Sequence, residues 1–180
     1  MKAAIVYWSA GGNTKKVAEV IRDTLSAAGI EVQLATVKEA AEIDYFDYDL
    51  FCFGFPSYHW APPAPVDRFL KAQFKKHQDA GLIRIGAPAV PGKHALVFVT
   101  YGGPHAGIDE ATPAGDYAGM YFHHAGIPVL EKIYTVGQFH RMGHFNVGGI
   151  LGDIRGRPNA DDLRQVRERV ESVIERLGHL

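Results

Sequence analysis

The sequence predicts one α/β domain, built on a doubly wound sheet of five parallel strands with helices on both faces. Apolar runs alternate with helical patterns from one end of the 180 residues to the other, which is typical of such sheets. Two runs, residues 3–8 and 50–54, are almost wholly apolar, as expected for central parallel strands that are buried on both faces. The length suits a single domain, which we expect to span residues 1–180.

The other elements follow in order along the chain. A helix is expected over residues 14–28, because apolar residues recur on one face from Val17 onward and Gly29 ends the pattern. Further strands are expected at 31–37, 95–100 and 127–136, and further helices at 65–77, 116–125 and 161–177. The last helix should begin after Asn159, a favourable N-cap that acidic residues follow.

Composition excludes several classes of protein. Cys52 is the only cysteine, so the chain can form no internal disulfide or cysteine-held cluster, and we expect this thiol to be a small buried apolar group. A formal net charge of −1 argues against a nucleic-acid surface. No apolar stretch reaches the ~20 residues of a membrane helix, and the first residues show no secretory signal, so a cytoplasmic location without membrane insertion is expected. The scattered histidines predict no metal site.

Two long irregular stretches, residues 101–115 and 138–158, follow the fourth and fifth expected strands. They therefore lie at the edge of the sheet where the strands end, which we call the carboxyl edge. Open α/β sheets bind their ligands at this edge, and long loops in compact domains are usually functional. A binding site is expected there.

The loop between the first strand and its helix has the residue types of a phosphate site. A helix start leaves backbone N–H groups unpaired, and glycines let the backbone approach an anion. The side chains of Ser9, Asn13 and Thr14 can donate further hydrogen bonds. The spacing matches neither the mononucleotide P-loop nor the dinucleotide-binding glycine pattern. The predicted phosphate ligands are Ser9, Ala10, Gly11, Gly12, Asn13 and Thr14.

The pattern Ser9-x-x-Gly12-Asn13-Thr14, placed directly after the first strand, resembles the FMN phosphate loop of flavodoxins, Ser/Thr-x-Thr-Gly-Asn-Thr. Gly11 stands where that pattern has its middle threonine, which removes one hydroxyl donor but no backbone donor. The resemblance implies a flavodoxin-like fold with strand order 2-1-3-4-5 and a non-covalently bound FMN.

The loop after the third strand carries Pro56, Ser57, Tyr58, His59 and Trp60. Its Gly-x-Pro-x-Tyr pattern resembles the corresponding loop of WrbA-like quinone reductases, which implies that these residues flank the flavin. The aromatic residues offer flat faces to an isoalloxazine ring. The alternative is that they pack beneath the loop as a small satellite core.

Two further segments resemble the same family. Thr100, Tyr101, Gly102 and Gly103 follow the fourth strand and are similar to a Ser/Thr-x-Gly-x-Gly-Gly loop that lines the pyrimidine edge of the flavin through backbone N–H groups. The pair His123-His124 resembles the histidines that precede the fifth strand in WrbA-like proteins, one of which reaches the flavin. His124 is our candidate, and the register leaves His123 open.

Three functions follow from these resemblances. The first is an FMN-dependent oxidoreductase that passes electrons from NAD(P)H to a quinone-like acceptor, with no protein acid or base assigned because the flavin performs the chemistry. The second is a flavodoxin-type one-electron carrier that docks to redox proteins. The third is a cofactor-free interaction domain. The near-zero net charge favours the enzyme, since carriers are typically strongly acidic. The long loops suggest self-association into a homo-oligomer.

Overall fold

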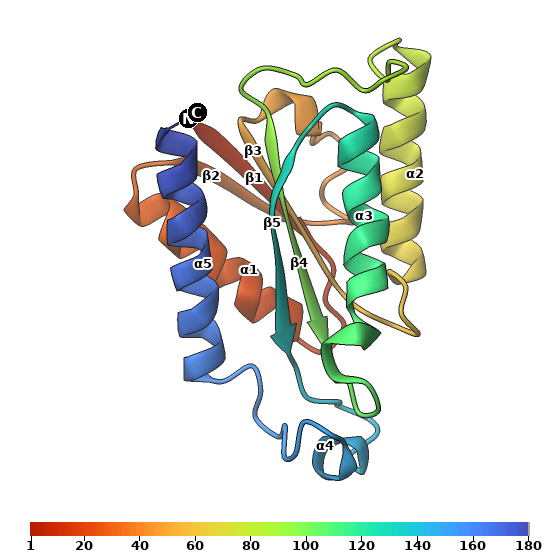
Figure 1. The fold of residues 1–180 in the computed structure, drawn as a ribbon, viewed down its shortest axis with the longest axis vertical. Helices are drawn as coiled ribbons and strands as arrows, with labels where there is room; N and C mark the ends of the chain where they lie inside the picture. Colours follow the sequence, from red (N-terminus) through yellow and green to blue (C-terminus); the bar gives the residue numbers. More distant parts are fainter. Residues whose placement is uncertain (180) are drawn as a thin grey trace.

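The computed structural model, which describes residues 1–179, has the predicted doubly wound sheet (Figure 1). All five strands are parallel, and their order is β2-β1-β3-β4-β5, which confirms the expected 2-1-3-4-5 arrangement. The strands are β1 (Lys2–Tyr7), β2 (Glu31–Thr36), β3 (Leu50–Pro56), β4 (His94–Tyr101) and β5 (Val129–Val136).

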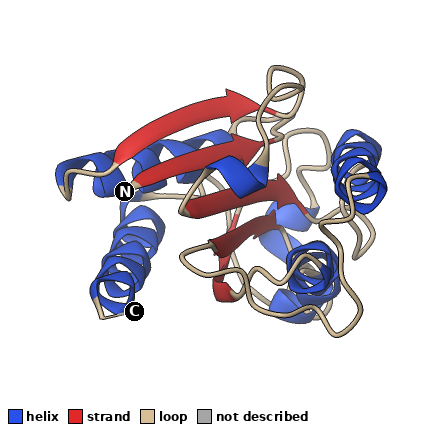
Figure 2. Ribbon diagram, turned by 90° about the horizontal axis from the view of Figure 1, so that it is seen from above, coloured by secondary structure: helices blue, strands red, loops and turns tan. Residues whose placement is uncertain are grey.

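Helices cover both faces of the twisted sheet (Figure 2). Helices α1 (Asn13–Ala27) and α5 (Ala160–Gly178) pack on one face, and α2 (Ala64–Asp79) and α3 (Thr112–His124) on the other. The short elements are the 3-10 turns η1 (Tyr45–Asp47) and η2 (Gly107–Glu110) and the one-turn helix α4 (Phe145–Gly148). Within residues 1–179, no helix combines the length and apolarity needed to cross a membrane.

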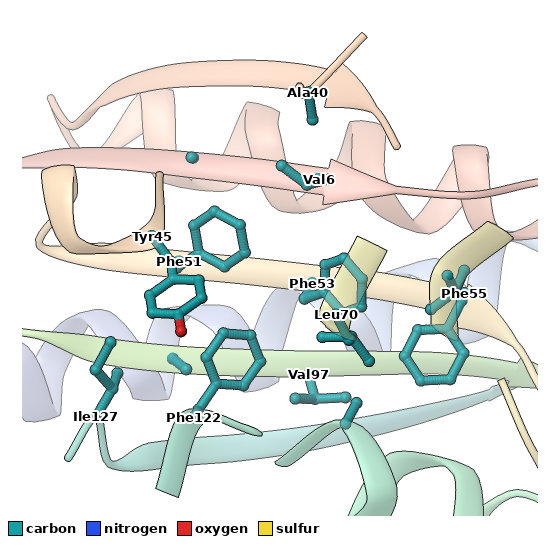
Figure 3. Packing of buried hydrophobic residues seen from close by; sticks show 14 of the residues in the cluster. Val6, Ala40, Tyr45, Phe51, Phe53, Phe55, Leu70, Val97, Phe122 and Ile127 are labelled. Carbon is teal, nitrogen blue, oxygen red and sulfur yellow. The ribbon is translucent and has the colours of Figure 1, made fainter. Parts of the chain in front are cut away.

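The central strand β3 divides the core by simple alternation. Phe51, Phe53 and Phe55 are all buried on the side of α2 and α3 (Figure 3). Cys52 points to the other face, where it is fully buried as expected, and burial raises the pKa of its thiol. Gly54 also faces this side, and a Cβ atom on it would lie 1.9 Å from Cε2 of Phe98. Only glycine fits there.

The helix ends agree with their local chemistry, and one helix, α3, begins several residues earlier than predicted. Asn159 caps α5 as predicted, and its side chain forms a reciprocal capping box with Asp162. Helix α3 begins at Thr112, four residues before the expected start, because Pro113 suits the first turn of a helix. The stretch predicted as irregular after the fifth strand contains α4.

Candidate functional site

The loops after β1, β3, β4 and β5 meet at the carboxyl edge of the sheet, the lower end in Figure 1. Strand register explains why they converge. Tyr7 pairs with Gly54 at the ends of β1 and β3, and Pro56 pairs with Thr100 at the ends of β3 and β4. The three predicted binding loops therefore begin side by side.

The loop after β1 presents a set of free backbone donors. Gly12 adopts a left-handed conformation (φ 93°), and α1 begins at the next residue. Its own N–H donates to the Ser9 hydroxyl (3.1 Å). In residues 1–179, no acceptor satisfies the backbone N–H groups of Ala10, Gly11, Asn13, Thr14 and Lys15. This arrangement suits an anion, because the donors and the positive end of the helix dipole act together.

Two side chains of this loop have partners that differ from the predicted ones. The Thr14 hydroxyl bonds the Thr100 hydroxyl (2.8 Å), and both residues are buried. The Asn13 side-chain amide donates to the Gln138 carbonyl (2.9 Å). In this structure these polar groups tie the loop to its neighbours, and their predicted contacts with a phosphate stay a prediction. The backbone N–H groups of the same residues are the donors that remain.

The loop after β3 holds its aromatic residues in an unusual turn. Tyr58 and Ala61 exchange two backbone hydrogen bonds (2.9 and 3.1 Å), which closes a two-residue turn over His59 and Trp60. Both central residues have positive φ (50° and 65°), a conformation that costs about 1–2 kcal/mol for each non-glycine residue. The turn leaves Tyr58 47% and Trp60 61% exposed, so these side chains do not form a core beneath the loop. Such local strain is common at functional sites.

Ser57 joins the second and third loops. Its N–H donates to the carbonyl of Thr100 (2.8 Å), and its hydroxyl donates to the carbonyl of Glu110 (2.6 Å). Pro56 is the last residue of β3, and Tyr101 is the last residue of β4. Burial raises the pKa of the Tyr101 hydroxyl. Pro56, Ser57 and Thr100 therefore build the frame of the site.

The loop after β4 has two kinds of backbone donor. The N–H groups of His105 and Ala106 both donate to the Glu110 carboxylate (2.7 Å each), which fixes the loop. The N–H groups of Gly102 and Gly103 have no acceptor in the part of the chain that the structure describes. They are the groups in this loop that a ligand can use.

The segment 137–159, which joins β5 to α5, supplies two residues that sequence reasoning missed. A Cβ atom on Gly102 would lie 2.1 Å from Cε2 of Phe139, and one on Gly11 would lie 2.0 Å from Cδ2 of His140. Both aromatic rings therefore rest on glycines of the predicted binding loops. The available signal was the long stretch after the fifth strand, which was expected at this edge. His140 is one of the scattered histidines from which no metal site is expected. Residues 1–179 contain no cluster suited to a metal ion.

His124 is the one predicted site residue that the structure separates from the others. It ends α3 just before β5 begins, at the opposite edge of the sheet from the loops (Figure 1). Its Nδ1 lies 2.8 Å from the carbonyl oxygen of Met120, and its ring contacts that of Phe74 on α2. Within one chain, His124 therefore lies away from the loops that are predicted to hold the ligand, because α3 runs antiparallel to the strands.

Solved structures share this fold over almost the whole chain. A flavodoxin from the domain Archaea aligns with a TM-score of 0.67 and 17% identity, covering 99% of this chain and 100% of its own. Flavodoxin 1 from Bacillus cereus aligns with a TM-score of 0.66 and 16% identity, covering 97% and 98%. A flavodoxin, WrbA-like protein from Agrobacterium tumefaciens aligns with a TM-score of 0.66 and 16% identity, covering 99% and 98%.

Sequence comparison identifies the family directly. No curated protein matches the chain. The sequence model of the flavodoxin family matches residues 5–137, a range that includes the first three loops of the site and all of β5. The chain therefore belongs to the flavodoxin family, and this membership implies FMN as its cofactor.

Proposed function

We propose that this chain binds FMN non-covalently and acts as a flavodoxin-type electron carrier. The observation that carries the proposal is the group of unpaired backbone N–H donors at the start of α1, those of Ala10, Gly11, Asn13, Thr14 and Lys15. Family membership and the coverage of whole flavodoxin chains support it. A dianionic phosphate matches these donors without a basic side chain in the loop, because charge-assisted hydrogen bonds contribute about 1.5–3 kcal/mol each.

The residues present fit the rest of FMN as well. Tyr58 and Trp60 expose flat aromatic faces beside the phosphate loop, and Trp8 packs edge-on against Tyr58 with ring centroids 5.8 Å apart. The N–H groups of Gly102 and Gly103 would hold the polar edge of the ring and stabilise negative charge there. Bound FMN would accept and donate the electrons, and the protein would bind it, orient it and shield it from water.

A second candidate is an NAD(P)H:quinone oxidoreductase of the WrbA type. The specific observation in its favour is the formal net charge of −1, since a carrier that relies on long-range steering is expected to be strongly acidic. One structural neighbour is named as WrbA-like. An enzyme of this kind would use NAD(P)H and a quinone-like acceptor as substrates. We also propose that the chain self-associates through its long loops.

Purified protein distinguishes these functions. Heating a yellow sample should release FMN, which chromatography identifies. If the protein is a carrier, the rate at which it oxidises NADH or NADPH with benzoquinone as acceptor should not exceed the rate with free FMN. A reductive titration of the carrier should show two separated one-electron potentials. Turnover well above the free-FMN rate would replace the carrier with the quinone reductase. A sample that neither contains FMN nor binds it would favour the cofactor-free interaction domain.

A further inference from the structure

The contact between His140 and the phosphate loop is not explained by packing of the core. Gly11 stands where the flavodoxin loop pattern has threonine, and a Cβ atom there would lie 2.0 Å from Cδ2 and 2.4 Å from Nε2 of His140. The imidazole therefore occupies the space into which a side chain at position 11 would project. His140 is nonetheless an exposed residue, so its imidazole is not part of the buried core. Gly11 and His140 are thus a complementary pair.

Several hydrogen bonds hold this part of the 137–159 segment in place. The Asn13 amide donates to the Gln138 carbonyl (2.9 Å). Buried Asn146 accepts from the N–H of Phe139 (2.7 Å) and donates to its carbonyl (2.9 Å). Because these bonds fix both residues that precede His140, its position over Gly11 follows from a built arrangement.

His140 also has the chemistry to meet an anion. Within residues 1–179, no carboxylate lies within ion-pair distance of its ring nitrogens. Its neighbour Gly11 carries one of the unpaired backbone N–H groups. An imidazole N–H is a hydrogen-bond donor, and a protonated ring adds a positive charge.

We propose that His140 is a phosphate-binding residue. Its side chain, which comes from the 137–159 segment, would make the contact with the phosphate that Gly11, having no side chain, cannot make. The inference rests on the proposed binding of FMN and adds a specificity-determining residue to it. It assigns His140 to the phosphate monoester, so the residue should matter for FMN and not for riboflavin, which has the same ring system without the phosphate.

Fluorescence titration of the apoprotein with FMN and with riboflavin tests this assignment. His140→Ala should weaken FMN binding about 10- to 100-fold, the equivalent of one charge-assisted hydrogen bond, and change riboflavin binding less than about twofold. His140→Gln keeps a side-chain N–H donor, so its FMN affinity should fall between those of wild type and His140→Ala. The matched control is His144→Ala, which removes an exposed histidine of the same segment whose ring packs on Phe145.

A double-mutant cycle with Gly11→Thr examines the pairing itself. In the wild-type background the threonine collides with the imidazole and should weaken FMN binding. In the His140→Ala background it has room, restores a hydroxyl donor and should strengthen FMN binding relative to His140→Ala alone. Additive losses in the two variants would overturn the pairing.

The remaining outcomes are also decisive. Equal losses of FMN and riboflavin affinity in His140→Ala would show a structural role and overturn the proposal. Unchanged FMN binding in His140→Ala would also overturn the proposal. Tighter FMN binding would overturn it too, because it would mean that the imidazole competes with the phosphate. If the wild-type apoprotein binds neither flavin, the proposed function itself fails, which separates that result from a failure of the His140 assignment.

Discussion

Replacing Thr14 or Thr100 by valine tests whether the first and third loops are held together by one buried hydrogen bond. The two hydroxyl oxygens lie 2.8 Å apart, and the residues are only 1% and 2% exposed. Valine has nearly the shape of threonine, so each substitution removes the hydroxyl and little else. The structure gives neither side chain another polar partner.

The expected magnitudes follow from this isolation. A single substitution leaves the other hydroxyl buried without a partner, which should lower the free energy of unfolding by about 1–3 kcal/mol. The Thr14→Val/Thr100→Val double variant leaves no unpaired group, so its cost should be under about 1 kcal/mol. The two sites should therefore be strongly non-additive.

Urea unfolding of the apoprotein, followed by tryptophan fluorescence and circular dichroism, measures these values without the stabilisation that bound FMN would add. Thr24→Val is a matched control, because its hydroxyl donates to the Val20 carbonyl within α1 and shares no partner with Thr100. The pair Thr24→Val/Thr100→Val should be additive. If the Thr14 and Thr100 variants are also additive, the hydrogen bond does not couple the loops and the reasoning fails.

Other substitutions probe the anion site, the core and an ion-paired cluster. Ala10→Asp places a carboxylate beside the unpaired N–H groups and should weaken FMN binding at least about tenfold relative to the neutral Ala10→Asn control; equal affinities in a titration would contradict the phosphate assignment. Gly54→Ala drives a methyl group into the aromatic ring that covers it and should cost about 1–3 kcal/mol in urea unfolding, whereas wild-type stability would show that the ring moves freely. Burial opposes ionisation of Asp44, but contacts with Lys76 and His77 outweigh it and hold the pKa of this carboxyl below its usual value. The ionised Asp44 carboxylate should therefore stabilise the fold above about pH 4, and this contribution should be lost as the pH falls further. The free energies of unfolding of wild type and Asp44→Asn should converge in acid. If the two pH profiles stay parallel, this expectation is refuted.

The sequence determined the features that depend on local chemistry. Apolar runs separated by helical patterns require a parallel sheet covered on both faces, and the fold follows. Asn159 caps α5 because its side chain reaches N–H groups only two and three residues away. The first loop presents unpaired donors because it precedes a helix, whatever the remainder of the chain does.

Only the tertiary structure decided which polar and aromatic groups meet. Thr14 finds its partner 86 residues away, and Asn13 finds its partner 125 residues away. Periodicity could not place His140 over Gly11, since that contact depends on how an irregular segment crosses the edge of the sheet. The role expected of His124 rested on a resemblance and not on periodicity, and the helix that carries it connects two parallel strands, so it ends at the edge where β5 begins, away from the loops. Backbone patterns are set by near neighbours, but side-chain partners are chosen among groups that only folding brings together.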